Sequence, residues 1–358
     1  MISIRPASDA DRPQILARIA EVFGREHAAR LDRLWEWQWR LDPRLPTPGY
    51  RGVVAERHGE IVGTLTTLPA GLQIGGKPVV AHWCVDCLVQ PDLRHRLLAE
   101  RARQGGQPPA ADAPRDIAAA LLDHPAAGPI QLVKHISPPG LRLLERAGFS
   151  AVADSGSLHR RVSLSHTLTG ALGRPLGAAL GAVADLALPL GPRPRLALEV
   201  LSGGFDARFD RLWEEIRGRY PAIGRRDART LEWRYRQHPE SDYRVVVTGD
   251  GARLRGYAVL LAYEKGRRRW AKIVDLLTAP GDTEAIRALA SGALRLLRDW
   301  RAERVETFAC GAGIAATLGA LGFVPRRARS GQALPLMVRA LPPAAAGLYA
   351  TQGDGDGG

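Results

Sequence analysis

The sequence is poor in cysteine and lacks a secretory signal. Three cysteines in 358 residues cannot form the framework of paired thiols that stabilises small secreted domains, so that class of protein is excluded. The chain opens with Met-Ile-Ser-Ile-Arg and runs directly into sequence with the periodicity of a folded domain. We therefore expect a protein of the reducing cytoplasm.

Metal-binding and nucleophilic motifs are also missing. Cys84 and Cys87 lie three residues apart on an expected strand, where they point to opposite faces and cannot share a metal ion. There is no zinc-ligand spacing, Walker loop or Ser-His-Asp signature. We expect no metal cofactor.

Lysine is scarce, and this affects how the charge is interpreted. Lysine supplies four of the 50 basic residues, and arginine supplies the rest. A formal net charge of +13 ordinarily suggests nucleic acid or another acidic surface as a partner. Here the arginines are scattered through every segment, and the densest run, at residues 267–269, falls at an expected turn. We attribute the charge to a composition rich in Ala, Arg, Gly and Pro and expect no nucleic-acid partner.

Long apolar runs are absent as well. The longest, at residues 171–191, contains Arg174, Asp185 and several glycines and prolines, which excludes a membrane-spanning helix. We expect a linker helix packed between two domains, with a helix lying on a membrane surface as the alternative.

An internal repeat organises the chain. Residues 36–43 recur as 232–239, residues 85–91 recur as 274–280, and the pair Gly148-Phe149 recurs as Gly322-Phe323. The offsets of 196, 189 and 174 residues keep the order of the motifs and place about 15 additional residues in the first copy, after Pro91. Two domains also suit the length of the chain.

Each copy has the same expected order of elements. A strand and a helix precede the aromatic motif, then come a hairpin, a strand carrying Val-Asp, a helix, a strand and a last helix that ends at glycine. We predict an α/β (α+β) fold, with a mixed, mostly antiparallel central sheet flanked by helices in each domain. The expected limits are 1–162 with an insertion near 94–114, a linker at 163–195, a second domain at 196–340 and a flexible tail at 341–358.

Several segments carry a family resemblance. The opening residues 4–11, the hairpin at residues 56–63 and the helix at residues 141–149 with its Gly-Phe ending resemble the GNAT (GCN5-related N-acetyltransferase) family. The resemblance implies a V-shaped split between two central strands, into which acetyl-CoA inserts like an extra strand. It also implies a pyrophosphate held on a glycine-rich loop at a helix N-terminus, and a carboxylate or histidine as base. The expected activity is transfer of an acetyl or related acyl group to an amine.

The cofactor loop departs from the family pattern in both copies. In the second, Asp282 and Glu284 suit a helix cap but repel a pyrophosphate, so we do not expect acyl-CoA there. In the first, Arg94 and Arg96 are candidate phosphate contacts, and Ala118 is a candidate for the final small residue of the loop. We therefore assign catalysis to the first copy.

The candidate site residues of the first copy lie on and near the Val-Asp strand. Asp86, His82 and His135 are candidate bases, although Asp86 recurs as Asp275, which leaves a purely structural role open. The backbone of Cys87, Leu88 and Val89 is expected to hold the thioester and pantetheine.

The aromatic motif supplies the candidate acceptor contacts. We expect Trp35 and Trp39 to be the freer rings and to contact the acceptor, and Trp37 and Trp233 to pack in the cores. Two alternatives to the acyltransferase remain. One is a non-catalytic GNAT-like binding protein that has lost CoA. The other is an aminoacyl-transfer relative that draws on charged tRNA, which the charge would favour.

Overall fold

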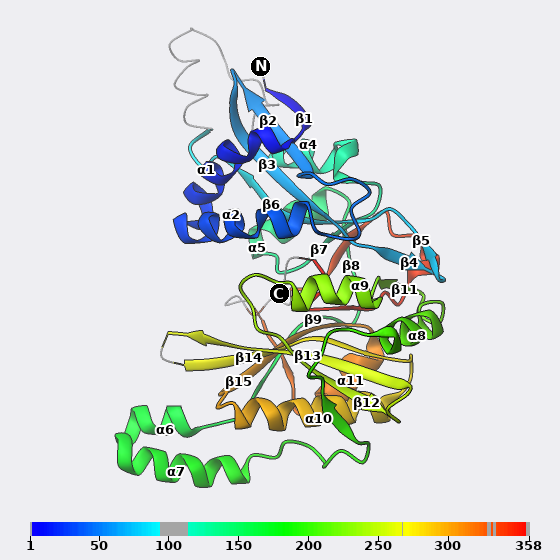
Figure 1. The fold of residues 1–358 in the computed structure, drawn as a ribbon. Helices are drawn as coiled ribbons and strands as arrows, with labels where there is room; N and C mark the ends of the chain where they lie inside the picture. The colour runs from blue at the N-terminus through cyan, green and yellow to red at the C-terminus, as the bar shows by residue number, and fades with distance from the viewer. Residues whose placement is uncertain (1, 94–113, 267, 328–330, 332–333, 356–358) are drawn as a thin grey trace. The chain divides into compact units, whose positions relative to one another are not determined.

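The computed structural model describes residues 2–93, 114–266, 268–327, 331 and 334–355. The chain forms two compact units (Figure 1). Unit 1 comprises Met1–Gly71, Val80–Ser150 and Met337–Leu341, and unit 2 comprises Leu72–Val79, Ala151–Leu336 and Pro342–Gly358. The candidate residues Arg94 and Arg96, and most of the expected insertion, lie outside the described residues.

The main sheet of unit 1 has the order β1-β2-β3-β6-β7-β17-β8. The pairs β1–β2, β2–β3, β3–β6 and β7–β17 are antiparallel, whereas β6 and β7 are parallel. The strands are β1 (Ser3–Pro6), β2 (Gly52–Arg57), β3 (Glu60–Pro69), β6 (His82–Val89), β7 (Gln131–Val133), β8 (Ser150–Ala151) and β17 (Met337–Arg339). The helices are η1 (Asp9–Asp11), α1 (Arg12–Phe23), α2 (Arg25–Trp39), α4 (Pro114–Asp123), η3 (Pro125–Ala127) and α5 (Pro138–Arg146).

Alternation along the strands of unit 1 gives the sheet two buried faces. Val53 and Ala55 of β2 share a hydrophobic cluster with Leu121 of α4 and Leu141 of α5. Val54 between them is equally buried and points to the opposite face. Helices α1 and α2 lie in front of the sheet in Figure 1, so helices cover both faces.

The main sheet of unit 2 has the order β10-β12-β13-β14-β15-β9-β16, and β18 also pairs with β15. Its strands are β9 (Ser155–Arg161), β10 (Leu198–Val200), β12 (Arg244–Gly249), β13 (Leu254–Lys265), β14 (Arg268–Thr278), β15 (Arg304–Cys310), β16 (Val324–Pro325) and β18 (Ala350–Thr351). A small second sheet contains β11 (Ala222–Gly224), β4 (Leu72–Ile74) and β5 (Lys77–Pro78). The helices are α6 (Ser165–Leu172), α7 (Arg174–Ala187), α8 (Ala207–Ile216), α9 (Ala228–Leu231), the π-helix η4 (Glu232–Arg236), α10 (Thr283–Asp299), α11 (Ala312–Ala320) and η5 (Pro343–Ala345).

The two main sheets repeat one plan. In each, three antiparallel pairings lead to the Val-Asp strand, which then pairs in parallel with the next strand, β7 or β15. The predicted mixed, mostly antiparallel α/β class is confirmed. Glycine ends the last helix of each copy as expected, because Gly148 and Gly322 both have φ of 81°. The next amide, of Phe149 or Phe323, then donates to a carbonyl five residues back.

The limits of the units differ from those expected. Strand β9 follows the first copy in sequence but pairs with β15 in unit 2, while β17 follows the second copy and pairs with β7 in unit 1. The two copies thus exchange one strand each. The expected limit at residue 162 followed chain order, which does not reveal the sheet that an edge strand joins.

The expected flexible tail is wrong for residues 342–355. Strand β18 pairs with β15, and Thr351, Gln352 and Asp354 are buried. The cause is an ion pair between Asp354 and the buried Arg226. The Gly- and Asp-rich composition of this segment hides that partner.

The expected linker segment forms two helices rather than one. Residues 165–187 form the two helices α6 and α7, and among the described side chains of α7 only Gly177 and Gly181 are buried. The main helix contact here joins α6 and α7, and Arg298 of α10 donates to the Asp185 carbonyl at the end of α7. In the described part of the chain, no helix is long and apolar enough to span a bilayer.

Candidate functional site

The central strands of unit 1 separate after two residue pairs. Strand β6 pairs with β7 only at His82–Gln131 and Trp83–Leu132, and β6 then continues to Val89 while β7 ends at Val133. Among the described residues, no strand pairs with this edge of β6 beyond Trp83. The edge therefore presents backbone N–H and C=O groups to an extended ligand.

A β-bulge lies on β6 at this edge. In β3, Thr66 faces Val85 and Thr64 faces Leu88, so Leu65 faces the two residues Asp86 and Cys87. The bulge is formed by Asp86 in the left-handed region, at φ of 46°. An extra residue of this kind re-aims the side chains that follow it.

The bulge separates side chains that a regular strand would place together. In an uninterrupted strand His82, Cys84 and Asp86 would share a face. Cys84 lies in the cluster with α4 and α5, whereas Asp86 meets His27 of α2, with 3.8 Å between Oδ1 and Nε2. Strict alternation fails because the bulge interrupts it between Cys84 and the end of the strand.

Asp86 and His27 form a half-exposed pair of titratable groups. The side chain of Asp86 is 17% exposed and that of His27 is 43% exposed, so solvent and substrate can reach both. A carboxylate beside an imidazole can accept and pass on a proton near neutral pH. The sequence did not reveal His27, because it lies 59 residues from Asp86 on an ordinary amphipathic helix.

His82 has a packing partner of its own. Its Nδ1 lies 3.2 Å from the carbonyl of Ala127, and burial lowers the pKa of His82. Gly128, with φ of 95°, presses against the ring, since a Cβ there would lie 2.2 Å from Nδ1. This geometry fits a neutral imidazole that anchors η3 to β6.

The other predicted residues of unit 1 are spread over three elements. His135 is exposed, has φ of 57° and precedes α5, whose N-cap Ser137 accepts from Gly140 N–H. Cys87 is exposed and Leu88 is buried, on the bulged part of β6. Val89, also on β6, is half-buried, while Ala118 is buried within α4.

The expectation that Trp35 and Trp39 are free is wrong. They are 1% and 0% exposed, and both rings contact Tyr50 at centroid distances of 4.8 Å. Trp35 Nε1 donates to Asp9, and the Tyr50 hydroxyl lies 2.7 Å from Thr66 Oγ1. Positions 35 and 39 are one turn apart on the buried face of α2, which excludes both rings from direct acceptor binding.

Trp37 was expected in the core and is instead half-exposed. Trp233, its counterpart in unit 2, is 4% exposed as expected.

In unit 2 the matching carboxylate is fully engaged. Asp275 is 2% exposed and pairs with Arg226, and it also accepts from the Tyr257 and Thr351 hydroxyls and the Leu276 N–H. Asp275 therefore has the purely structural role that the sequence left open for this position.

The split between the central strands of unit 2 holds the chain's own segment 350–354. Strands β14 and β15 pair only over Trp270–Lys272 and Arg304–Glu306. Beyond that, β18 pairs with β15, and Gly353 N–H donates to the Val274 carbonyl of β14 at 2.6 Å. The segment lies between the two strands like an additional strand.

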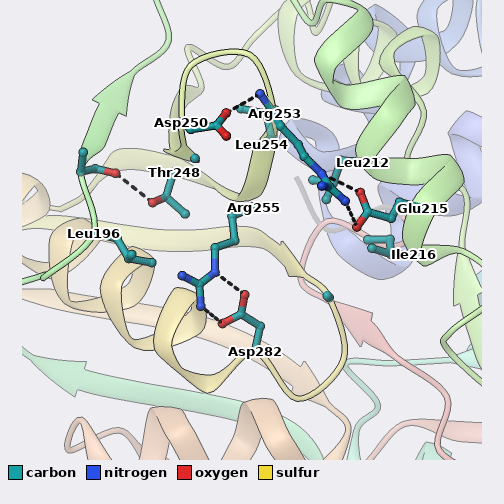
Figure 2. A pocket seen from close by; sticks show the side chains of 13 residues that line it. Leu196, Leu212, Glu215, Ile216, Thr248, Asp250, Arg253, Leu254, Arg255 and Asp282 are labelled. Atoms are coloured by element: carbon teal, nitrogen blue, oxygen red, sulfur yellow. Dashed lines mark hydrogen bonds and ion pairs between the residues drawn. The ribbon is translucent and has the colours of Figure 1, made fainter.

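The N-terminus of α10 is also occupied, as Figure 2 shows. Asp282 accepts from Ala285 N–H and pairs with Arg255 at 2.7 Å, which confirms it as a helix cap. The neighbouring cavity of about 450 Å³ holds a second pair, Arg253 with Glu215. Both arginines are neutralised, so this end of α10 offers no excess charge to a phosphate.

The N-terminal part of the chain is similar to a known protein family. Residues 3–101 match the family model described as an acetyltransferase (GNAT) domain. This part of the chain is therefore similar to GNAT acetyltransferase domains. No curated protein sequence matches the chain.

Solved structures share the fold over nearly the whole chain. A GCN5-related N-acetyltransferase from Anabaena variabilis matches with a TM-score of 0.60 and 14% identity, over 95% of this chain and 73% of that one. N-myristoyltransferase from Saccharomyces cerevisiae with bound myristoyl-CoA matches with a TM-score of 0.53 and 12% identity, over 94% and 83%. A probable N-acyltransferase from Enterococcus faecalis matches with a TM-score of 0.53 and 10% identity, over 95% and 72%. At these identities the likeness establishes the GNAT fold.

Proposed function

We propose that unit 1 is an acyl-CoA-dependent N-acyltransferase domain that modifies an amine. The observation that carries the proposal is the open edge of β6 beside its bulge. Pantetheine contains two amide groups, and the edge of β6 that faces away from β3 offers matching backbone donors and acceptors between Cys87 and Val89. GNAT domains use such a split for this purpose, and one of the solved structures of similar fold holds myristoyl-CoA.

The pair Asp86–His27 is proposed to accept the proton of the attacking amine. The amine nitrogen forms a bond to the thioester carbon, the carbon–sulfur bond breaks, and the nitrogen loses one proton to the carboxylate or imidazole. A backbone N–H of the bulge steadies the oxyanion of the thioester. The departing thiolate takes its proton from solvent, because Leu144, which stands where relatives often carry tyrosine, is buried and apolar.

Unit 2 is proposed to be non-catalytic. Segment 350–354 occupies the split between the central strands of unit 2. Asp275 accepts hydrogen bonds from Leu276 N–H and the Thr351 hydroxyl, and Asp282 caps the N-terminus of α10. The contrast with unit 1 supports a single acyl-CoA site in the chain.

Binding and turnover test the proposal separately. Acetyl-CoA and longer acyl-CoAs should raise the melting temperature of the full chain, as a ligand of the folded state does. Free CoA thiol should then appear when a panel of amines is added. Asp86→Asn should lower turnover at least about 100-fold and keep the thermal shift, and His58→Asn, at an exposed position of the same unit, should retain both.

The alternatives predict other results. No shift with any acyl-CoA would sink the acyltransferase and favour a GNAT-like binding protein without CoA. Salt-dependent binding of charged tRNA, without an acyl-CoA shift, would favour the aminoacyl-transfer relative.

A further inference from the structure

The helices α6 and α7 of unit 2 expose a row of apolar side chains. Along α7, Leu176, Leu180, Val183 and Leu186 recur every three or four residues and lie along one side of the helix, and Leu172 ends α6 just before them. Their exposed fractions are 45% for Leu172, 56% for Leu176, 44% for Leu180, 65% for Val183 and 83% for Leu186. Single exposed apolar residues are ordinary, but a contiguous row marks an interaction surface.

The inner side of this hairpin is already closed. A Cβ at Gly177 would lie 2.4 Å from the Leu168 carbonyl, and one at Gly181 would lie 2.5 Å from Ser165 Cα. The two helices therefore pack backbone against backbone through these glycines. The apolar row lies outside that contact, so it does not form the core of the hairpin.

The hairpin shows no free acidic charge. Asp185 is the one acidic residue between positions 165 and 187. Its carboxylate accepts from Leu164 N–H and from the hydroxyls of Ser163 and Ser165, at 2.5 to 2.7 Å. These hydrogen bonds hold the Asp185 carboxylate at the N-terminus of α6.

Arginines follow the hairpin along the chain. The chain after α7 follows α10, because Arg298 donates to the Asp185 carbonyl and Arg295 donates to the Gly191 carbonyl. Figure 1 shows this segment running beside α10. Burial chiefly, and then the neighbouring charges of Arg193 and Arg298, lower the pKa of Arg295.

A cavity of about 190 Å³ lies on the same segment. Its charged lining consists of Arg193, Arg195, Arg287 and Glu284, and Glu284 pairs with Arg255 at 2.8 Å. Within the described residues, the three lining arginines have no carboxylate partner. The cavity therefore has uncompensated positive charge and the size for a phosphate group.

We propose that the α6–α7 hairpin and this arginine cavity together form a docking surface for an anionic phospholipid bilayer. The apolar row enters the level of the upper acyl chains, and the arginines contact lipid phosphates. Charge decides between a bilayer and a second copy of the chain, since a net charge of +13 repels a like copy and attracts anionic lipid. This surface is independent of the acyltransferase site.

Vesicle flotation with the full chain tests the surface. Binding is expected to phosphatidylcholine vesicles that contain phosphatidylglycerol, to weaken with salt, and to be absent with phosphatidylcholine alone. Val183→Glu, and the double change Arg193→Ala with Arg195→Ala, should each weaken binding about tenfold or more. The matched controls Val324→Glu and Arg229→Ala change exposed residues elsewhere in unit 2 and should bind as the parent does.

Four results would overturn the proposal. One is a lack of flotation with anionic vesicles, and another is flotation that Val183→Glu leaves unchanged. The third is a dimer that Val183→Glu dissociates, which would assign the face to a second copy. Thermal stabilisation by inorganic phosphate without vesicle binding would likewise reduce the cavity to a simple ion site. Leu186→Glu replaces Val183→Glu if the latter melts early, since Leu186 is the most exposed of the row.

Discussion

His27 Nε2 lies 3.8 Å from Asp86 Oδ1, across the gap between α2 and the bulge of β6. The pair exists because Asp86 adopts a left-handed conformation that brings its carboxylate beside α2. A regular strand would leave it on the face of Cys84.

This pair gives the first prediction. Asp86→Asn should lower kcat roughly 100-fold to 10,000-fold, the range typical of losing a general base, with KM for acyl-CoA unchanged. His27→Ala should lower kcat as well, because the imidazole shares the proton. His58→Asn, at an exposed left-handed turn position, is the control and should retain full activity. An active Asp86→Asn enzyme would contradict the assignment.

The buried ion pairs of unit 2 give a second prediction. Asp354→Ala leaves the Arg226 guanidinium buried without one of its two carboxylates and should lower the free energy of unfolding by about 3–5 kcal/mol. Glu215→Ala, which breaks the exposed pair with Arg253, should cost less than about 1 kcal/mol. Urea denaturation measures both. Equal losses would show that segment 350–354 contributes no more than a surface contact.

Much of the fold was predictable because local chemistry determined it. The turn at His58-Gly59 was expected from sequence, and both residues have positive φ, as a tight hairpin requires. Gly148 and Gly322 ended their helices as expected because a left-handed C-cap favours glycine. In each case the residues that decide the conformation are adjacent in the chain.

The candidate site was less predictable because it depends on distant contacts. A period-two pattern carries no sign of the extra residue at Asp86, so the sequence does not reveal which face of the sheet its carboxylate reaches. The sequence gives no sign that Trp35 and Trp39 are buried, because the ring that packs against both belongs to Tyr50, which lies outside their helix. The exchange of β9 and β17 depends on which sheet edge each strand reaches, and no local signal specifies that.

Acid stability gives a third prediction. The hydrogen bond from Arg5 lowers the pKa of Asp11 from 3.8 to about 2. A lowered carboxyl pKa stabilises the folded state above the unfolded value, and this stability is lost as pH falls from about 4 to about 2. Partial exposure of Arg5 reduces the contribution to roughly 1–2 kcal/mol.

The variant Arg5→Met tests that contribution. It should be less stable than the parent near neutral pH, and the difference should shrink between pH 4 and pH 2. Glu56 also bonds Arg5, so Glu56→Gln separates its part from that of Asp11. A difference independent of pH would show that Arg5 acts through packing alone.

The contact between Gly128 and His82 gives the last prediction. Gly128→Ala places a Cβ 2.2 Å from His82 Nδ1 and strains a residue whose φ is 95°, so it should destabilise unit 1 by roughly 2–4 kcal/mol. His82→Ala removes the clash but leaves the backbone strain, so the double variant should recover only part of the loss. A double-mutant cycle measured by thermal unfolding separates the two terms. Additive losses would show that the imidazole moves aside freely, and the anchoring role of His82 would then fail.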